Sequence, residues 1–248
     1  MRFLLYNIAY GTGAPRSMSH HVLGMPRYLL SSRHHFARIR EFIVGLSPDI
    51  VGLVEVDRGS YRTNRLSQVQ DLSRALSHVD HFSSKYGHRS LLRYLPLARH
   101  QGNALLARRA FASCRSHFFN VGVKRLVLEG HVFGVTVFLV HLALRKRARL
   151  RQCGLLAELV GRPAGPVIVA GDFNAFSGRA ELAELMRRTG LCWGSPHVMP
   201  TYPSWSPQYE LDFILCSRDI RVNACSVMHD ACFSDHLPLL LDFSVSGE

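Results

Sequence analysis

Two polar side chains, Asp172 and Asn174, follow a short apolar run at residues 166–170. The run is β-branched and uncharged, which is typical of a strand buried on both faces. Because the two polar residues lie two positions apart, an extended backbone points both side chains the same way. Burying an unpaired amide costs about 2–7 kcal/mol, so these groups need partners or a function. Taken alone, Asp172 is equally well explained as a cap for a helix that begins near Ser177, with Asn174 in a turn.

Polar residues of the same kinds recur at or beside the ends of other predicted strands. They are Asn7, Glu55, His141, Asp235 and His236. Ligands bind at strand ends in α/β sheets, and capping alone does not account for so many positions. Carboxylate and amide oxygens suit Mg²⁺ or Mn²⁺, a carboxylate can activate a water, and histidines can stabilise or protonate phosphoryl oxygens. The set points to metal-dependent hydrolysis of a phosphate ester, and no serine or cysteine stands in a recognisable nucleophile motif.

The composition is that of a globular and strongly basic protein. Of 248 residues, 47% are hydrophobic and 19% are charged, and 30 Lys and Arg against 18 Asp and Glu give a formal net charge of +12. Such an excess favours polyanionic partners, among them nucleic acid and phospholipid head groups, without choosing between them. A soluble basic protein without a polyanionic partner has the same composition.

The cysteines and the apolar runs bear on the compartment. Six cysteines form no C-x-x-C pair and no zinc-type spacing, which favours a reducing compartment. No apolar run approaches the roughly 20 residues that span a bilayer, and the N-terminus does not resemble a signal peptide. We therefore expect a cytoplasmic protein without a transmembrane segment, and we expect it to be a monomer.

Strands and helices alternate along the chain, with no linker and no short repeat. This alternation predicts a single α/β domain over residues 1–248, and consecutive strands near 102–141 and 211–245 predict a mixed sheet. We expect helices at 33–46, 65–78, 145–160 and 178–189, with the basic run from Arg145 to Arg151 on a solvated face. We expect strands at 2–8, 50–54, 102–108, 115–120, 123–129, 131–140, 166–170, 211–216, 220–228 and 237–245, a hairpin turn at Glu129 and Gly130, and loops at 11–32, 84–101 and 191–209.

Seven stretches in a characteristic order cover nearly the whole chain. They are LLYNIAYG (4–11), GLVEVD (52–57), GNALLAR (102–108), LVHLAL (139–144), VAGDFNAF (169–176), ELDFILCS (210–217) and SDHLPLLLDF (234–243). Together they resemble the endonuclease/exonuclease/phosphatase superfamily, which includes pancreatic-type deoxyribonucleases, AP endonucleases, inositol polyphosphate 5-phosphatases and neutral sphingomyelinases. The resemblance implies a four-layer α/β sandwich, two packed mixed β-sheets flanked by helices. It also implies a phosphoesterase that uses Mg²⁺ or Mn²⁺ and direct attack by water.

The resemblance implies roles for the residues around the metal and the attacking water. Glu55 would be the principal metal ligand, with Asn7 and Asp235 close to the metal or to its waters. Asp172 would position and activate the attacking water. Asn174 would hydrogen-bond the scissile phosphate.

It implies roles for two histidines as well. His236, oriented by Asp212, would stabilise the transition state, because a carboxylate sets the tautomer of an imidazole. His141 would bind phosphate or act as a general acid, as in the deoxyribonuclease-like branch. Asn103, in GNALLAR, is expected to contact substrate.

The substrate is less well defined than the reaction. AP endonucleases follow the metal-binding glutamate with Thr-Lys, whereas Val56 and Asp57 stand here. Arg145 lies four residues after His141, within reach of a phosphate, and Trp205 lies in an aromatic loop that could stack a base or meet a lipid. We favour nucleic acid over a phospholipid head group as the phosphate-ester substrate. The alternatives are a phospholipid- or phosphoinositide-directed phosphoesterase of the same fold and a non-catalytic module that binds polyanions.

Overall fold

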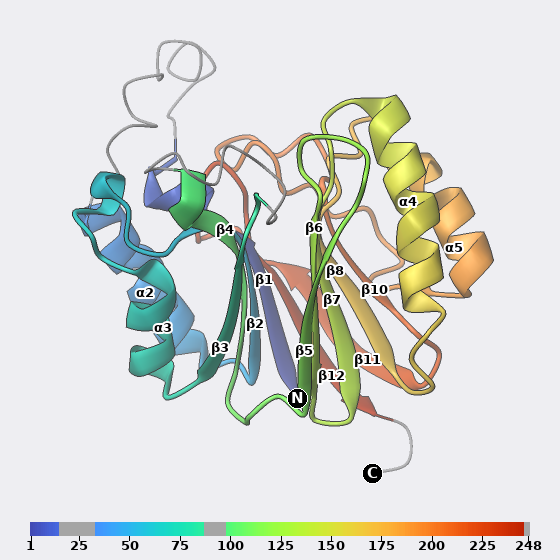
Figure 1. Ribbon diagram of the computed structural model, residues 1–248, viewed down its shortest axis with the longest axis horizontal. Helices are drawn as coiled ribbons and strands as arrows, with labels where there is room; N and C mark the ends of the chain where they lie inside the picture. Colours follow the sequence, from blue (N-terminus) through green and yellow to red (C-terminus); the bar gives the residue numbers. More distant parts are fainter. Residues whose placement is uncertain (15–32, 87–97, 246–248) are drawn as a thin grey trace.

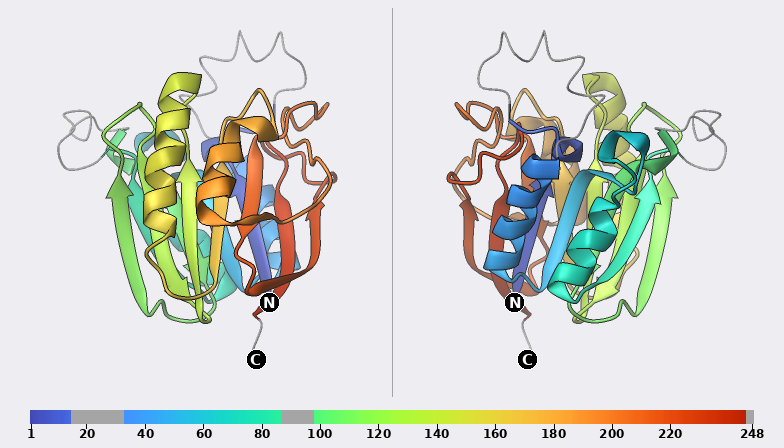
Figure 2. Two further views of the ribbon diagram at one scale, coloured as in Figure 1. Left: turned by 90° about the vertical axis from the view of Figure 1, so that its right-hand side faces the viewer. Right: turned by 90° about the vertical axis from the view of Figure 1, so that its left-hand side faces the viewer.

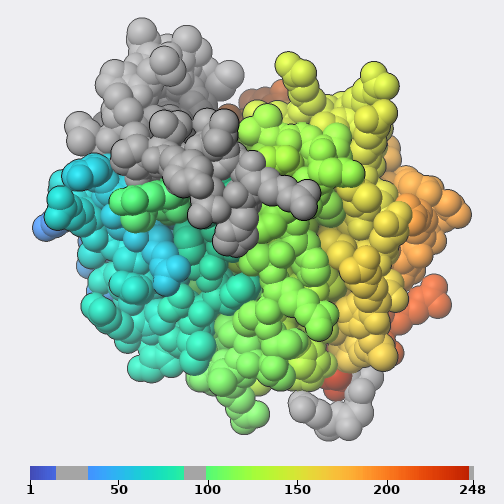
Figure 3. All heavy atoms as spheres, in the orientation of Figure 1, coloured from blue at the N-terminus to red at the C-terminus, as the bar shows by residue number. Residues whose placement is uncertain are grey.

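The protein folds as a four-layer α/β sandwich, which confirms the predicted fold class (Figure 1). The computed structural model describes residues 1–14, 33–86 and 98–245. In these residues, two six-stranded mixed sheets pack face to face, and helices cover both outer faces (Figures 1 and 2). In the space-filling view, residues coloured cyan to teal lie on the left and residues coloured yellow to orange lie on the right (Figure 3).

The first sheet has the order β11-β12-β1-β2-β4-β3, in which β1 and β2 are parallel and the other neighbours are antiparallel. Helices α2 (Arg33–Leu46) and α3 (Gln68–Leu76) cover it. Its strands are β1 (Arg2–Asn7), β2 (Ile50–Asp57), β3 (Val79–Ser84), β4 (Gln101–Ala107), β11 (Ile220–Val227) and β12 (Leu239–Val245).

The second sheet has the order β5-β6-β7-β8-β10-β9, in which β7 and β8 are parallel and the other neighbours are antiparallel. Helices α4 (Lys146–Val160) and α5 (Ala183–Thr189) cover it. Its strands are β5 (Ser113–Phe118), β6 (Leu126–Val132), β7 (Val135–His141), β8 (Val167–Asp172), β9 (Cys192–Trp193) and β10 (Asp212–Cys216).

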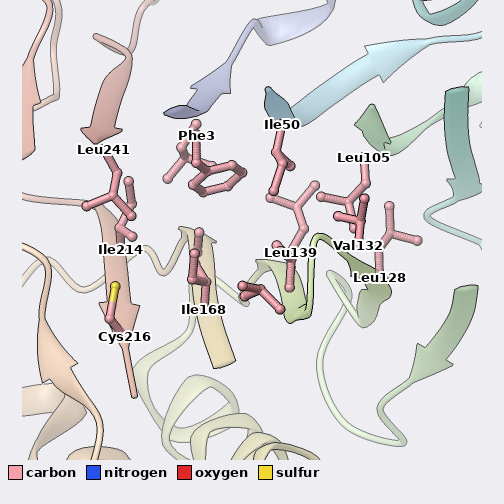
Figure 4. Packing of buried hydrophobic residues seen from close by; sticks show 14 of the residues in the cluster. Phe3, Ile50, Leu105, Leu128, Val132, Leu139, Ile168, Ile214, Cys216 and Leu241 are labelled. Atoms are coloured by element: carbon pink, nitrogen blue, oxygen red, sulfur yellow. The ribbon is translucent and has the colours of Figure 1, made fainter. Parts of the chain in front are cut away.

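Strands buried on both faces build the core. In β1, Phe3 and Leu5 face the layer between the sheets, whereas Leu4 and Tyr6 pack with α2 and α3. This period of two puts apolar side chains on both faces of the strand. Side chains from both sheets point toward one another in the central layer (Figure 4). Each fully buried Leu or Phe contributes about 1.5–3 kcal/mol, so this layer aligns the sheets and hence the loops at their edge.

The site residues meet because of the strand directions. Parallel β7 and β8 end together, with His141 opposite Asp172. Antiparallel β10 begins at the same place, with Asp212 opposite Asp172. β1 ends at Asn7, and the chain enters β12 just after His236. One edge of the sandwich therefore collects residues from strands far apart in the sequence.

β2 bulges at Glu55 and continues to Asp57, beyond the predicted end of the strand at 54. Leu53 pairs with Ala104, but Val56 pairs with Gly102, so β2 holds one extra residue there. Glu55 has a φ of 54°, a left-handed conformation that is unfavourable for a non-glycine residue. Its backbone N–H donates to Asn103 Oδ1 at 3.2 Å, so Asn103 holds the bulge in place.

The hairpin turn predicted at Glu129 and Gly130 is wrong. Both residues lie inside β6, and the chain turns instead at Phe133 and Gly134, where φ is 52° and 72°. Gly130 serves packing, because a Cβ there would lie 2.9 Å from the ring of Phe111. A glycine that admits an aromatic ring and a glycine that turns the chain look the same in sequence.

Other boundaries also differ from the prediction. Residues 79–84 form the edge strand β3, which the periodicity did not reveal, and the short strand β9 lies within the predicted loop 191–209. α3 begins only after Ser67, whose side chain accepts a hydrogen bond from Gln70 N. Most of the predicted loop at 11–32 and the middle of the one at 84–101 fall outside the described residues. None of the described helices has the length and apolarity needed to cross a membrane.

Arg149 departs from the predicted solvated face of α4. Its side chain is 4% exposed and donates to Glu181 Oε2 at 2.6 Å, while Nη1 donates to the carbonyls of Ala143 and Leu144. Those carbonyls belong to the segment that follows His141. The ion pair therefore ties the start of α4 to the site edge.

We expect Arg149→Ala to lower the free energy of unfolding by about 3–5 kcal/mol, because it leaves the Glu181 carboxylate buried without its partner. Urea denaturation followed by circular dichroism measures this. Arg147→Ala removes an exposed arginine from the same helix and should change stability little. Equal effects of the two substitutions would contradict the structural role of Arg149.

We expect Asn103→Ala to lower the free energy of unfolding by about 1–3 kcal/mol, because the amide of Glu55 loses its acceptor in a buried strand. Asn223→Ala, at an exposed position of β11, is the control. Urea titrations of both variants test the prediction, and an unchanged midpoint for Asn103→Ala would refute it.

Candidate functional site

Asp172 lies at the centre of the candidate site. Gly171 before it is required, because a Cβ there would lie 1.9 Å from the carbonyl oxygen of Val140 in β7. The Asp172 side chain is 2% exposed. Its Oδ1 accepts from Asn174 N at 2.9 Å, and its Oδ2 accepts from Asn7 Nδ2 at 3.1 Å. The carboxylate is thus oriented by groups from both sheets.

Two histidines lie against the same carboxylate. His141 Nε2 is 3.3 Å and His236 Nε2 is 3.9 Å from Asp172 Oδ2. Burial alone would raise the pKa of Asp172, but His141, His236 and Lys124 lower it below its ordinary value. Asp172 is therefore ionised at neutral pH and can orient a water molecule.

His236 is held by Asp212 on the side away from Asp172. Its Nδ1 is 2.7 Å from Asp212 Oδ2, which also accepts from Thr201 Oγ1 at 2.6 Å. Burial disfavours the charged imidazolium, yet Asp212, Asp172 and Asp235 raise the pKa of His236 to about 10. Burial raises the pKa of Asp212. The pair places a protonated imidazole, with Nε2 as donor, at the edge of the site.

Glu55 and His141 form the other side of the site, together with Lys124. Lys124 Nζ is 3.8 Å from Glu55 Oε1 and contacts His141 Nε2, while His141 Nδ1 is 4.0 Å from Glu55 Oε1. Burial opposes ionisation of Glu55, but Lys124, His141 and Lys85 lower its pKa. Burial and Lys124 lower the pKa of His141. His141 Nε2 cannot accept a hydrogen bond from Lys124 and donate one to Asp172 at the same time. Whether Nε2 carries a proton therefore depends on which of these two residues it bonds.

A divalent metal has two candidate places among the described residues. Ligand atoms of Asp172, Asp212 and His236 lie within 4.8 Å of one another, a group that includes neither Glu55 nor Asp235. A metal bound there at His236 Nε2 would displace the proton that this imidazole could donate to a substrate oxygen. Glu55, in contrast, is an ionised oxygen donor that already attracts a cation, the ammonium of Lys124. The donor chemistry at Glu55 fits a hard divalent ion better.

The remaining predicted site residues lie around this centre, and their roles stay predictions. Asn174 has a φ of 52°, and its Nδ2 donates to Leu142 O at 2.9 Å, which leaves its second N–H for a ligand. Asp235 adjoins His236, and its carbonyl accepts from Ser204 N at 2.8 Å. That bond places half-buried Trp205 close to the His236 segment. Arg145 is exposed and lines a groove together with Lys124.

The sequence analysis missed three residues that the structure brings to the site. Lys124 precedes β6, and its Nζ lies 3.8 Å from Glu55 Oε1. Lys85 follows β3 and lowers the pKa of Glu55. Thr201 lies in the loop before β10 and bonds Asp212. Only the two lysines could have been noticed in the sequence, because lysine is rare in this chain: three of its 30 Lys and Arg residues are lysine.

These groups together suit attack of water on a phosphate ester. Asp172 can hold the water, and His236 can donate a proton or a hydrogen bond to developing negative charge on oxygen. The Asn174 amide offers a neutral donor beside them.

Comparison with solved structures finds the same fold in other proteins. A mannosyl-6-phosphatase from Bacteroides thetaiotaomicron has a TM-score of 0.73 at 16% identity, covering 98% of this chain and 99% of that one. An endonuclease/exonuclease/phosphatase from Beutenbergia cavernae has 0.73 at 20% identity, covering 100% and 72%. The human Nocturnin catalytic domain with bound sulfate has 0.68 at 21% identity, covering 99% and 94%.

Sequence comparison gives the family directly. No curated protein sequence matches this chain significantly. The profile of the Endonuclease/Exonuclease/phosphatase family matches residues 4–236, a span that runs from β1 to His236. Because that span covers nearly all of the chain, the protein belongs to the Endonuclease/Exonuclease/phosphatase family.

Proposed function

We propose that the protein is a phosphodiesterase that depends on Mg²⁺ or Mn²⁺ and acts on nucleic acid. The observation that carries the proposal is the buried Asp172 carboxylate, which lies between His141 and the His236–Asp212 pair. Family membership supports hydrolysis of a phosphate ester. The choice of a nucleic acid diester rests on charge and aromatic surface.

Asp172 would hold the attacking water and accept its proton as the bond to phosphorus forms. Its Oδ1 and Oδ2 are already oriented by Asn174 N and Asn7 Nδ2, so little reorganisation is needed. The imidazolium of His236 would donate from Nε2 to a phosphoryl oxygen, while Asp212 keeps Nδ1 occupied. The leaving oxygen departs on the opposite side of phosphorus and takes a proton from solvent or a neighbouring acid.

A bound divalent ion would neutralise charge on the phosphoryl oxygens. Glu55 is the residue best suited to hold it, with Asn7 and Asp235 as further oxygen donors. Asn7 Oδ1 accepts from Ala9 N at 3.1 Å, which orients the side chain and leaves a lone pair for a ligand.

An aromatic cluster beside His236 supports a nucleic acid substrate. The ring of Tyr202 lies 4.9 Å from that of His236, and the ring of Phe176 lies 6.4 Å from Tyr202 and 5.5 Å from Tyr209. Phe176 and Tyr209 are 43% and 42% exposed. Exposed rings next to a phosphate site can stack bases, and the net charge of +12 favours a polyanionic strand.

We expect Asp172→Asn to lower kcat by about 10²–10⁴-fold with the fold retained, because the amide cannot accept the proton of water. Hydrolysis of DNA, RNA, phosphoinositides, sphingomyelin and p-nitrophenyl phosphate is measured with Mg²⁺, Mn²⁺ or EDTA. Asp219→Asn, an exposed acid, is the matched control. Metal-dependent cleavage of any panel member that survives in folded Asp172→Asn would refute the role of Asp172, and cleavage of lipid alone would refute the nucleic acid assignment.

We expect the double variant Phe176→Ala, Tyr209→Ala to bind single-stranded oligothymidylate about 10-fold more weakly in EDTA, because base stacking is lost. Fluorescence anisotropy with a labelled strand measures this, and Tyr61→Ala removes an exposed ring elsewhere as a control. An abasic strand should bind the double variant as it binds the unaltered protein. An equal loss of affinity for both strands would argue against stacking.

A further inference from the structure

A small pocket with a volume of about 100 Å³ opens beside Glu55 and His141. His236 and the aromatic cluster do not line it, so it lies on the other side of the site. Its charged lining is Glu55, Lys85, Lys124 and Arg125. We call it the Lys85–Lys124 pocket. Three cations against one carboxylate give it a net positive charge.

Lysine is rare in this chain, and its distribution is uneven. Of three lysines among 30 Lys and Arg residues, two line this pocket. The third, Lys146, lies on the surface and donates to Ser177 Oγ at 3.3 Å. A lysine presents a compact charge with three donors, whereas an arginine presents a planar fork. The pocket thus departs from the arginine usage of the rest of the chain.

Among the described residues, Lys85 forms no direct ion pair, although Glu55 lies close enough to interact with it electrostatically. Its Nζ donates to the Tyr10 hydroxyl at 3.0 Å and lies 5.2 Å from the ring centroids of Tyr10 and Tyr86. Burial and the neighbouring Lys124 lower the pKa of Lys85, and Glu55 only partly opposes this shift. Two of its three N–H groups are left for another acceptor. An anion in the pocket would compensate this charge.

Lys124 connects the pocket to the reaction centre. Its ammonium contacts Glu55 and His141 and also lines the pocket wall. An anion held by Lys85 and Lys124 would therefore lie next to the scissile phosphate, not at a remote site.

We propose that the Lys85–Lys124 pocket binds a second phosphate group of the substrate, adjacent to the phosphate that is cleaved. This inference rests on the proposed phosphodiesterase function and narrows its substrate to esters with neighbouring phosphates. A nucleic acid strand and a multiply phosphorylated small molecule share that chemistry. Charge-assisted hydrogen bonds from lysine supply the recognition.

Metal-free binding tests the pocket without turnover. Calorimetric titration in EDTA compares thymidine 3′,5′-bisphosphate with both thymidine monophosphates, and inositol 1,4-bisphosphate with inositol 1-phosphate. We expect one bisphosphate to bind about 10-fold more tightly than its monophosphates. Lys85→Met should abolish that preference, Lys85→Arg should retain most of it, and Lys146→Met should leave it unchanged.

A kinetic arm separates this proposal from the proposed function. With Mg²⁺, the dinucleotide TpT is compared with pTpT and TpTp, and we expect a lower KM for a phosphorylated form that Lys85→Met removes. Metal-dependent cleavage with no preference for the added phosphate would overturn the pocket assignment alone. No cleavage, with a Lys85-dependent preference for a bisphosphate in EDTA, would overturn the function and support the pocket. A preference that Lys146→Met reduces as much as Lys85→Met would overturn the pocket assignment, since it would reflect general charge.

Discussion

A buried carboxylate, Asp172, imposes the main constraint on this structure. Its side chain is 2% exposed and ionised, so the fold must supply partners for both oxygens. Asn7 comes from the first sheet, whereas Asn174 N and His141 come from the second. Satisfying one carboxylate therefore requires both sheets to pack in a single register, and the apolar layer between them maintains that register.

Backbone strain accumulates around the same point. Glu55 and Asn174 both adopt left-handed φ values. At position 171 only glycine lets β8 approach the carbonyl oxygen of Val140, because any Cβ would collide with it. Each unfavourable conformation is held by a hydrogen bond: the Glu55 amide bonds Asn103, and the Asn174 amide bonds Asp172. The packed sheets stabilise these conformations, and the bulge at Glu55 interrupts the alternation of side chains along β2.

The two sides of the site differ in chemistry. Beside Glu55 lie ammonium groups, with Lys124 at the centre and Lys85 behind it. Beside His236 lie aromatic rings, with Tyr202 packed on the imidazole. The ammonium groups on the first side would attract the phosphates of a substrate, and the aromatic rings on the second side would stack against an attached ring or base. This asymmetry gives the site a direction along which an extended substrate can lie.

The sequence by itself determined the two-sided apolar strands, the helix over 33–46 and the polar residues that follow the strands, because these depend on local periodicity. The order of its motifs indicated the family and the sandwich fold. Only the tertiary structure decided that Lys124 meets Glu55, that Thr201 bonds Asp212, and that Arg149 is buried against Glu181. Those contacts join segments that are distant in the chain. A turn glycine such as Gly134 differs from a packing glycine such as Gly130 in its tertiary neighbours, because only Gly130 lies against an aromatic ring, that of Phe111. Local pattern carries no information about such neighbours, which the packing of two sheets brings together.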